Sequence, residues 1–337
     1  MKAGPALFFT TTLLAQSWQP QISNTRASLR GVSAIDSRTV WASGSARTWL
    51  LTTDGGATWR AAQVPGAEAL DFRGIHAIDA RTAYLMSAGP GDKSRIYKTT
   101  DAGQHWLLLL TNSDPKGFFD SIAFWDALQG IVVGDQVDGR AEVLTTSDGG
   151  ASWQRRAPPD GLPNEGSFAA SNTCLTLSGA RDAWFATGGP GAGRVFHSPD
   201  RGLTWTVAPT PIRKDSASAG IFSLAFAGPR RGVAVGGDYA KDKEDRQNIV
   251  LTSDGGATWT APPGPVPAGF RSAVVFVPAR KLWIATGTSG SDISTDSGQT
   301  WKPFDNASYN AMGFAQSGDG WAVGAQGRIA RFQPPAH

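Results

Sequence analysis

Arginines recur at the start of predicted β-strands, and their guanidinium groups could bind a carboxylate or a phosphate. Arg30, Arg73 and Arg271 each open a short apolar run, and we expect these three positions to be equivalent and to lie beside one channel. A second set opens another predicted strand: Arg95, Arg194 and Arg328. Guanidinium groups bind both anions through charge-assisted, often bidentate hydrogen bonds. The pattern predicts a basic patch on one face; the alternative is that these arginines cap strand edges or pair with nearby aspartates.

Other residue types that commonly carry catalysis form no recognisable motif. The four histidines lack the spacing of metal ligands, and there is no nucleophile elbow, phosphate-binding loop or dinucleotide fingerprint. Cys174 is the only cysteine, and we expect it to be buried on a strand. We therefore predict no catalytic residue, no metal and no cofactor.

A motif of Ser/Thr, any, Asp, any, Gly, any, any, Trp occurs six times, first at Thr52 to Trp59. It lies between apolar β-like runs, so we expect a hairpin turn whose Asp and Ser/Thr side chains bond to the turn backbone. The glycine permits a backbone conformation that other residues resist, and the tryptophan buries a large ring between neighbouring sheets. The motif residues are Asp54, Asp101, Asp148, Asp200, Asp254 and Asp296 with Trp59, Trp106, Trp153, Trp205, Trp259 and Trp301.

These copies follow one another at intervals of 42 to 54 residues, a period typical of β-propeller blades. We predict an all-β, seven-bladed propeller of four-stranded antiparallel blades. Seven inner strands are expected at 30–35, 73–78, 120–124, 173–177, 222–226, 271–276 and 310–314.

Six motifs accompany seven expected inner strands, and the two ends of the chain account for the difference. The last repeat stops near Gln333, before a motif of its own. Residues 17–20, around Trp18, match residues 300–303, around Trp301. We expect this N-terminal strand to complete the last blade and to remove the exposed sheet edges that invite aggregation. The propeller would then span 16–334 as a single domain, with 335–337 as a tail.

The N-terminal 15 residues are typical of a secretory signal peptide. Lys2 precedes an apolar run at 6–15, after which the chain becomes polar. We therefore expect a secreted or periplasmic protein. No apolar stretch is long enough to span a membrane, and a net charge of +3 without clustered Lys/Arg does not favour nucleic acid.

The six motifs match the BNR/Asp-box repeat of sialidases and other WD40/YVTN/BNR-like propellers. The fuller blade pattern, with its Trp-Ala or Val-Gly strand and Thr-Thr-Asp-Gly-Gly-x-Thr-Trp turn, resembles the photosystem II stability/assembly factor family from Trp18 to Phe332. The resemblance implies a secreted or lumenal propeller that binds protein during assembly of a larger complex. It does not carry the photosynthetic role itself, because bacterial relatives occur outside photosynthesis.

Two alternatives stay open beside this binding scaffold. In a sialidase-like glycosidase, the first three arginines would hold a substrate carboxylate, with Tyr309 and Glu165 as further candidates. A glycan-binding propeller would need exposed aromatic side chains, for which the candidates are Phe118, Phe119, Phe168 and Phe270. We favour a monomeric, non-catalytic scaffold for a protein partner, acidic or part of a membrane-associated complex.

Overall fold

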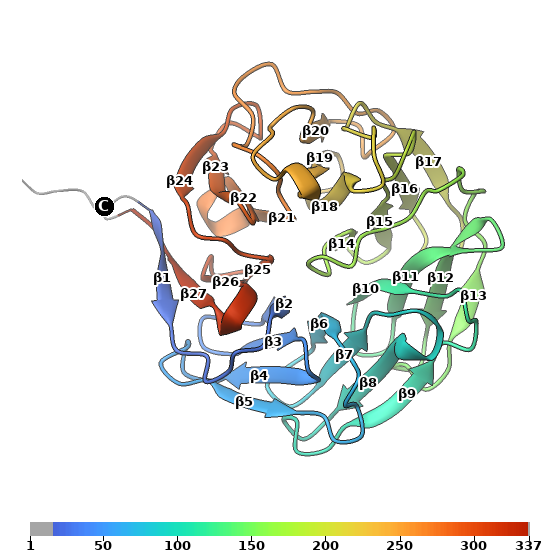
Figure 1. Ribbon diagram of the computed structural model, residues 1–337, viewed down its shortest axis with the longest axis vertical. Coiled ribbons are helices and arrows are strands. Elements are labelled where there is room, and N and C mark those ends of the chain that lie inside the picture. Colours follow the sequence, from blue (N-terminus) through green and yellow to red (C-terminus); the bar gives the residue numbers. More distant parts are fainter. Residues whose placement is uncertain (1–15, 336–337) are drawn as a thin grey trace, which may run out of the picture.

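The computed structural model describes residues 16–335, which form a closed ring of seven sheets (Figure 1). Each sheet is one blade, and the blades are numbered here in the chain order of their inner strands. The inner strands face the central axis, as the expected propeller requires. They are β2 (Leu29–Ala34), β6 (Phe72–Ala77), β10 (Phe119–Phe124), β14 (Leu175–Ser178), β18 (Ala219–Ala227), β21 (Ala273–Val277) and β25 (Ala311–Phe314).

Further strands follow outward, each antiparallel to the one before. The second strands are β3 (Val40–Gly44), β7 (Ala83–Ser87), β11 (Gly130–Val137), β15 (Asp182–Ala186), β19 (Arg231–Asp238), β22 (Leu282–Gly287) and β26 (Gly320–Val323). The third strands are β4 (Thr48–Thr52), β8 (Arg95–Thr99), β12 (Arg140–Thr146), β16 (Arg194–Ser198), β20 (Ile249–Thr252), β23 (Gly290–Ser294) and β27 (Ile329–Gln333).

The outer strands are short, and in blade 5 a single bridge between Leu251 and Thr260 takes the place of one. The others are β5 (Arg60–Gln63), β9 (Leu107–Thr111), β13 (Gln154–Arg156), β17 (Thr206–Pro209), β24 (Lys302–Asp305) and β1 (Ser17–Gln21). Four 3-10 helices lie in connections: η1 (Gly91–Lys93), η2 (Tyr239–Lys241), η3 (Pro278–Arg280) and η4 (Ala325–Gly327).

The ring is closed by strands from the two ends of the chain, which confirms the predicted closure. β1 pairs with β27, with Trp18 opposite Phe332, and the two strands lie side by side in Figure 1. The Trp18 ring is buried among Phe304, Tyr309 and Phe332, and its indole N–H donates to Ser291 Oγ at 3.0 Å. The first strand therefore joins blade 7 to blade 6.

A tryptophan contributes to the hydrophobic cluster between each pair of neighbouring blades. Second and third strands are buried on both faces, so their side chains form seven clusters among the described residues. Each motif tryptophan lies in a different cluster, and Trp18 lies in the seventh. Because apolar burial is the main favourable term in folding, these clusters hold the ring together.

The six aspartates occupy hairpin turns between third and outer strands, and we call these the aspartate turns. In the first, Thr52 donates to Asp54 Oδ1 at 2.7 Å, and Asp54 accepts from the N–H and the hydroxyl of Thr58 at 2.9 and 2.6 Å. Gly56 has a φ of +87°, which favours glycine. The bonds from Thr58 hold the pKa of Asp54 well below its usual range.

No helix within residues 16–335 is long and apolar enough to cross a membrane. The expected signal peptide at 1–15 lies outside the described residues, as do residues 336 and 337 of the expected tail. The secreted or periplasmic location therefore stays a prediction.

Candidate binding site at the channel mouth

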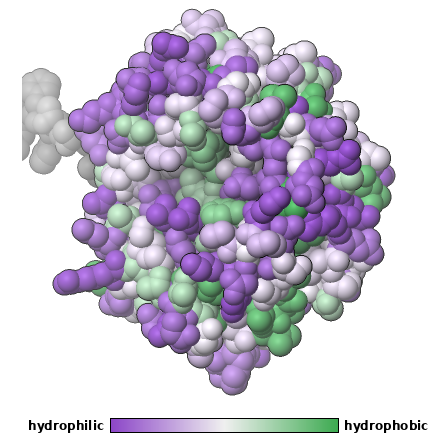
Figure 2. Space-filling view, turned by 45° about the vertical axis from the view of Figure 1, so that its right-hand side comes forward, coloured by the Kyte–Doolittle hydropathy of each residue, from purple (hydrophilic) through white to green (hydrophobic). Residues whose placement is uncertain are grey.

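One end of the channel opens into a cavity of about 430 Å³, which we call the mouth cavity. It lies at the starts of the inner strands, on the face that carries Tyr239 of η2. Figure 2 shows hydrophobic surface in a hollow near the middle of the molecule, with hydrophilic side chains around it. The lining of the mouth cavity includes Arg30, Arg73, Asp120, Asp135, Phe118, Phe168, Phe222, Tyr239, Phe270, Ser272 and Asn310.

Six lining residues come from one equivalent position in six different blades. In blades 1, 2, 3 and 5 this position is the unpaired residue of a register shift, such as Arg30 between Leu29 and Gly31. Such a shift leaves one residue out of the ladder and re-aims its side chain. The six are Arg30, Arg73, Asp120, Phe222, Ser272 and Asn310. In these six blades the repeat thus directs one side chain at the channel, and the residue type at this position varies among them.

The two arginines supply the positive side of the cavity. Arg73 Nε donates to Asp71 Oδ2 at 2.9 Å. Arg30 Nε is buried and has no hydrogen-bond partner among the described residues. Burial and the nearby charge of Arg73 lower the pKa of Arg30. A buried donor without a partner costs free energy, so the Arg30 guanidinium is suited to donate hydrogen bonds to an anionic group of a ligand.

Two carboxyl groups from blade 3 lie in the same cavity, one buried and one half-buried. Asp120 is 1% exposed, and its Oδ2 has no hydrogen-bond partner among the described residues. Asp135 accepts a hydrogen bond from the Ser167 N–H at 3.0 Å. Burial raises the pKa of Asp120 well above its ordinary value, and the charge of Asp135 adds to this effect. Burial also raises the pKa of Asp135 to about 6.

Aromatic rings form an apolar wall in this cavity. Phe168 stacks on Phe222 with ring centroids 3.8 Å apart, and Phe270 meets Phe222 edge-on at 4.7 Å. Tyr239 also contacts Phe222 edge-on at 6.0 Å and is 56% exposed. The cavity therefore combines charged and apolar surface, which is typical of ligand sites.

The connection between blades 3 and 4 carries Phe168 into the mouth and is fixed by a buried ion pair. Arg194 Nε donates to Glu165 Oε1 at 2.9 Å, and the side chains are 14% and 2% exposed. The Thr187 hydroxyl and the Leu162 N–H also donate to Glu165, at 2.5 and 2.8 Å. These bonds hold residues 166–170 over the end of the channel.

Arg271 does not occupy the expected position. It lies one residue before the channel-facing position, which Ser272 takes, and its side chain is 1% exposed. Its Nε donates to Asp292 Oδ2 at 2.5 Å, and its other nitrogens donate to Ser289 and to backbone carbonyls. The expected equivalence with Arg30 and Arg73 is wrong, because a one-residue difference in register turns a side chain to the opposite face of a strand.

The second expected set of arginines is held by local contacts. Arg95 pairs with Asp92, Arg194 with Glu165, and Arg328 donates to the Ser308 carbonyl at 2.6 Å. Of the six candidate arginines, the structure brings only Arg30 and Arg73 together in the mouth cavity.

Tyr309 and Glu165, the further candidates of the glycosidase alternative, do not line the cavity. Tyr309 is 2% exposed and packs on Trp18, and burial raises its pKa to about 12. Glu165 serves as the anchor for Arg194. Among the glycan-binding candidates, Phe118, Phe168 and Phe270 do line it, whereas Phe119 is fully buried.

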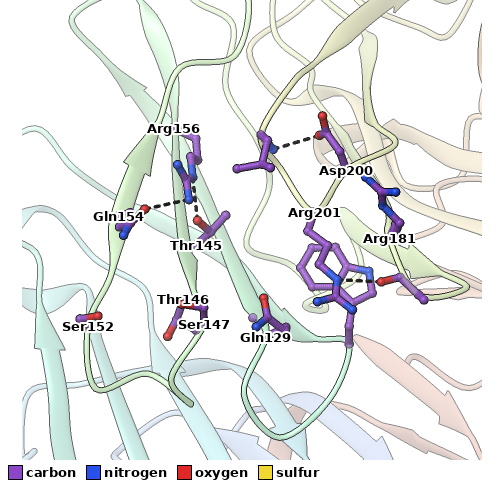
Figure 3. A pocket seen from close by; sticks show the side chains of 14 residues that line it. Gln129, Thr145, Thr146, Ser147, Ser152, Gln154, Arg156, Arg181, Asp200 and Arg201 are labelled. Carbon is purple, nitrogen blue, oxygen red and sulfur yellow. Dashed lines mark hydrogen bonds between the residues drawn. The ribbon is translucent and has the colours of Figure 1, made fainter.

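A second concavity lies between blades 3 and 4, on the face of the aspartate turns. This groove of about 480 Å³ has Arg156 on one wall and Arg181 and Arg201 on the other (Figure 3). Arg156 donates to Thr145 Oγ1 at 2.8 Å and to Gln154 at 2.9 Å. A similar groove of about 410 Å³ lies between blades 5 and 6, so the fold itself produces such grooves.

Sequence reasoning missed Asp120 and Asp135. Asp120 carried a signal, because it stands at the start of the third inner strand, where Arg73 stands in the second. Asp135 lies at the far end of the next strand, and no sequence pattern placed it beside Asp120.

No protein-family model and no curated protein matches the chain. Solved structures are similar over nearly all of it. YCF48 bound to a D1 peptide shares 17% identity and a TM-score of 0.67, covering 97% of this chain and 98% of its own. YCF48 from Cyanidioschyzon merolae shares 16% identity with a TM-score of 0.65, and the match covers 95% of this chain and 99% of its own. A streptogramin B lyase shares 14% identity with a TM-score of 0.67, and the match covers 94% of this chain and 97% of its own. The likeness establishes a propeller fold resembling that of YCF48, and a fold by itself does not decide between binding and catalysis.

Proposed function

We propose that the protein is a secreted or periplasmic, non-catalytic scaffold that binds an acidic segment of a protein partner in its mouth cavity. The observation that carries the proposal is the buried Arg30 Nε without a partner, beside Arg73 and an aromatic wall. A ligand anion would satisfy this donor, and apolar ligand groups would cover the rings. We infer a role in assembly or stability of a larger complex.

Two further observations support this reading. The BNR/Asp-box motifs and the blade pattern resemble photosystem II stability/assembly factors. The fold is also similar to that of YCF48, one structure of which holds a D1 peptide. Both point to a peptide as the ligand class for this chain.

A peptide library tests the proposal directly. Peptides displayed with free C-terminal carboxylates, and the same peptides amidated, would be captured by the wild-type protein and by the double variant R30A/R73A. We expect the wild type to select acidic sequences and the double variant to lose at least about tenfold in affinity, because two charge-assisted contacts disappear.

Arg181→Ala is the matched control, because it removes an exposed positive charge from the opposite face. It should bind as the wild type does. Equal capture by R30A/R73A would place binding on another surface. Hydrolysis of a sialoside that depends on Arg30 and Arg73 would instead establish the glycosidase alternative.

A further inference from the structure

The mouth cavity contains two carboxyl groups that the proposed anion site does not require. Asp120 comes from β10 and Asp135 from the neighbouring strand β11, and both line the cavity. Asp120 is almost completely buried, and its Oδ2 has no partner among the described residues. An ionised carboxylate in that position would be costly, because buried charges need a partner. The cavity is therefore incomplete without a proton or a ligand.

Neighbouring groups neutralise these two carboxyls only in part: the charge of Arg73 opposes the rise in the pKa of Asp120 but does not outweigh burial. Arg73 from β6 donates to Asp71, and no hydrogen bond joins it to Asp120. Arg30 from β2 lines the same cavity. The Cys174 thiol, just before β14, is buried, and burial raises its pKa. The other packed elements supply uncharged groups, namely Ser167, Phe222, Ser272 and Asn310, with Asp242 held at the rim by Thr288. Glu165, near Asp135, is committed to Arg194.

The protonation of Asp120 and Asp135 decides the sign of the cavity's charge. With both ionised, three carboxylates including Asp71 face the two guanidinium groups, for a net charge of −1. With both protonated, only Asp71 opposes the arginines, and the net charge is +1. An anion would meet repulsion in the first state and attraction in the second.

We propose that the mouth cavity binds its anionic ligand together with a proton, with the Asp120 carboxyl donating its O–H to the ligand and Asp135 taking up a proton from solvent. The proposal rests on the proposed function of the cavity. Protonation gives Asp120 the donor that an anion needs, as a third group beside Arg30 and Arg73. Burial, which raises the pKa of both carboxyls, favours the protonated state.

A permanently charged probe isolates the protons of the protein from those of the ligand. Benzenesulfonate has an aromatic ring for the apolar wall and an anion that does not titrate in the working range. Its affinity would be measured by calorimetry from about pH 5.5 to about pH 8, on either side of the Asp135 pKa. We expect the affinity to fall about tenfold as the pH rises, because binding takes up a proton.

Variants assign the effect to the two residues. Asp135→Asn should keep the high affinity of acidic solution throughout and lose most of the pH dependence. Asp138→Asn removes an exposed carboxylate three residues away and should behave as the wild type. Asp120→Asn, whose amide can still donate, should bind benzenesulfonate at both ends of the range, whereas Asp120→Ala should lose about tenfold.

The outcomes separate this inference from the proposed function. Binding that R30A/R73A abolishes but that does not change with pH would overturn the proton coupling and leave the anion site in place. Benzenesulfonate affinity that rises with pH would also overturn it, because ionisation of the two carboxyls would then not oppose the anion. No binding by the wild type at about pH 5.5 would overturn both.

Discussion

Aspartates of the aspartate turns are exposed or half-exposed and have complete sets of hydrogen bonds. At the mouth, Asp135 is half-buried, and Asp120 is buried with an oxygen that has no partner among the described residues. Asp148 accepts from the Ser152 N–H and hydroxyl at 2.9 and 2.6 Å, and these bonds lower its pKa to about 2. Asp135 shows the opposite shift, because burial raises its pKa to about 6. One residue type thus serves turn structure on one face and is suited to ligand binding on the other.

The two faces differ because the repeat keeps the same residue types in the aspartate turns but not at the mouth. The six aspartate turns preserve both residue types and bonds, so each copy is explained by the local geometry of a hairpin. At the mouth, equivalent positions hold arginine, aspartate, phenylalanine, serine and asparagine. Variation on a rigid scaffold is where function is expected. In this ring, positions that keep the same residue type from blade to blade maintain the fold, and equivalent positions with different residue types line the candidate site.

The largest effect should come from the framework, through Trp18. Trp18→Ala removes the ring that fills the cluster between blades 6 and 7, and we expect a loss of about 4 kcal/mol in the free energy of unfolding. Urea denaturation followed by tryptophan fluorescence measures it. Ile22→Ala, in the same N-terminal segment at 80% exposure, should change stability little. Equal, small losses in both variants would show that ring closure does not limit stability.

Substitutions of Arg271 and Arg30 should affect stability and binding differently, because the first arginine is at a buried position just before its inner strand and the second is at the channel-facing position of its own. Arg271→Ala leaves Asp292 buried without its partner, and we expect a loss of about 3 kcal/mol in the free energy of unfolding. Arg30→Ala removes a buried nitrogen without a partner, so it should change stability by less than about 1 kcal/mol while weakening peptide capture. Denaturation and capture measured on both variants check this. A large loss of stability in Arg30→Ala would contradict the distinction.

This pair also shows where sequence reasoning stops. Spacing of the six motifs and the match around Trp18 were sufficient for the seven blades and for closure, because period and hydrophobic pattern fix strands and neighbours. The site depended on single register positions. Phe270-Arg271 copies Phe72-Arg73 in sequence, yet the arginine takes the buried place that Phe72 has in blade 2. Its partner, Asp292, lies 21 residues further on.

A smaller effect is expected for the half-buried carboxyl Asp135. Its folded-state pKa of about 6 is above the ordinary value near 4, so the folded protein binds this proton more tightly than the unfolded chain. Ionisation therefore costs stability as the pH rises from about 4 to about 6. Asp135→Asn, which retains an acceptor for Ser167, should be more stable than the wild type by about 2 kcal/mol at pH 8. Urea denaturation at several pH values should show this gain vanish near pH 4.

The smallest effect, and one of opposite sign, should come from Asp148. Its folded-state pKa of about 2 is below the ordinary value near 4, so its stabilisation is present above about pH 4 and is lost as the pH falls toward 2. Asp148→Asn should lower Tm at pH 7 by less than Asp135→Asn raises it, because the carboxylate is exposed and the amide still accepts one hydrogen bond. The Tm difference from the wild type should shrink as thermal scans move from pH 7 to pH 3, with Asp138→Asn as the exposed control. A difference that persists unchanged at pH 3 would mean that the turn depends on side-chain shape rather than on the charge of its aspartate.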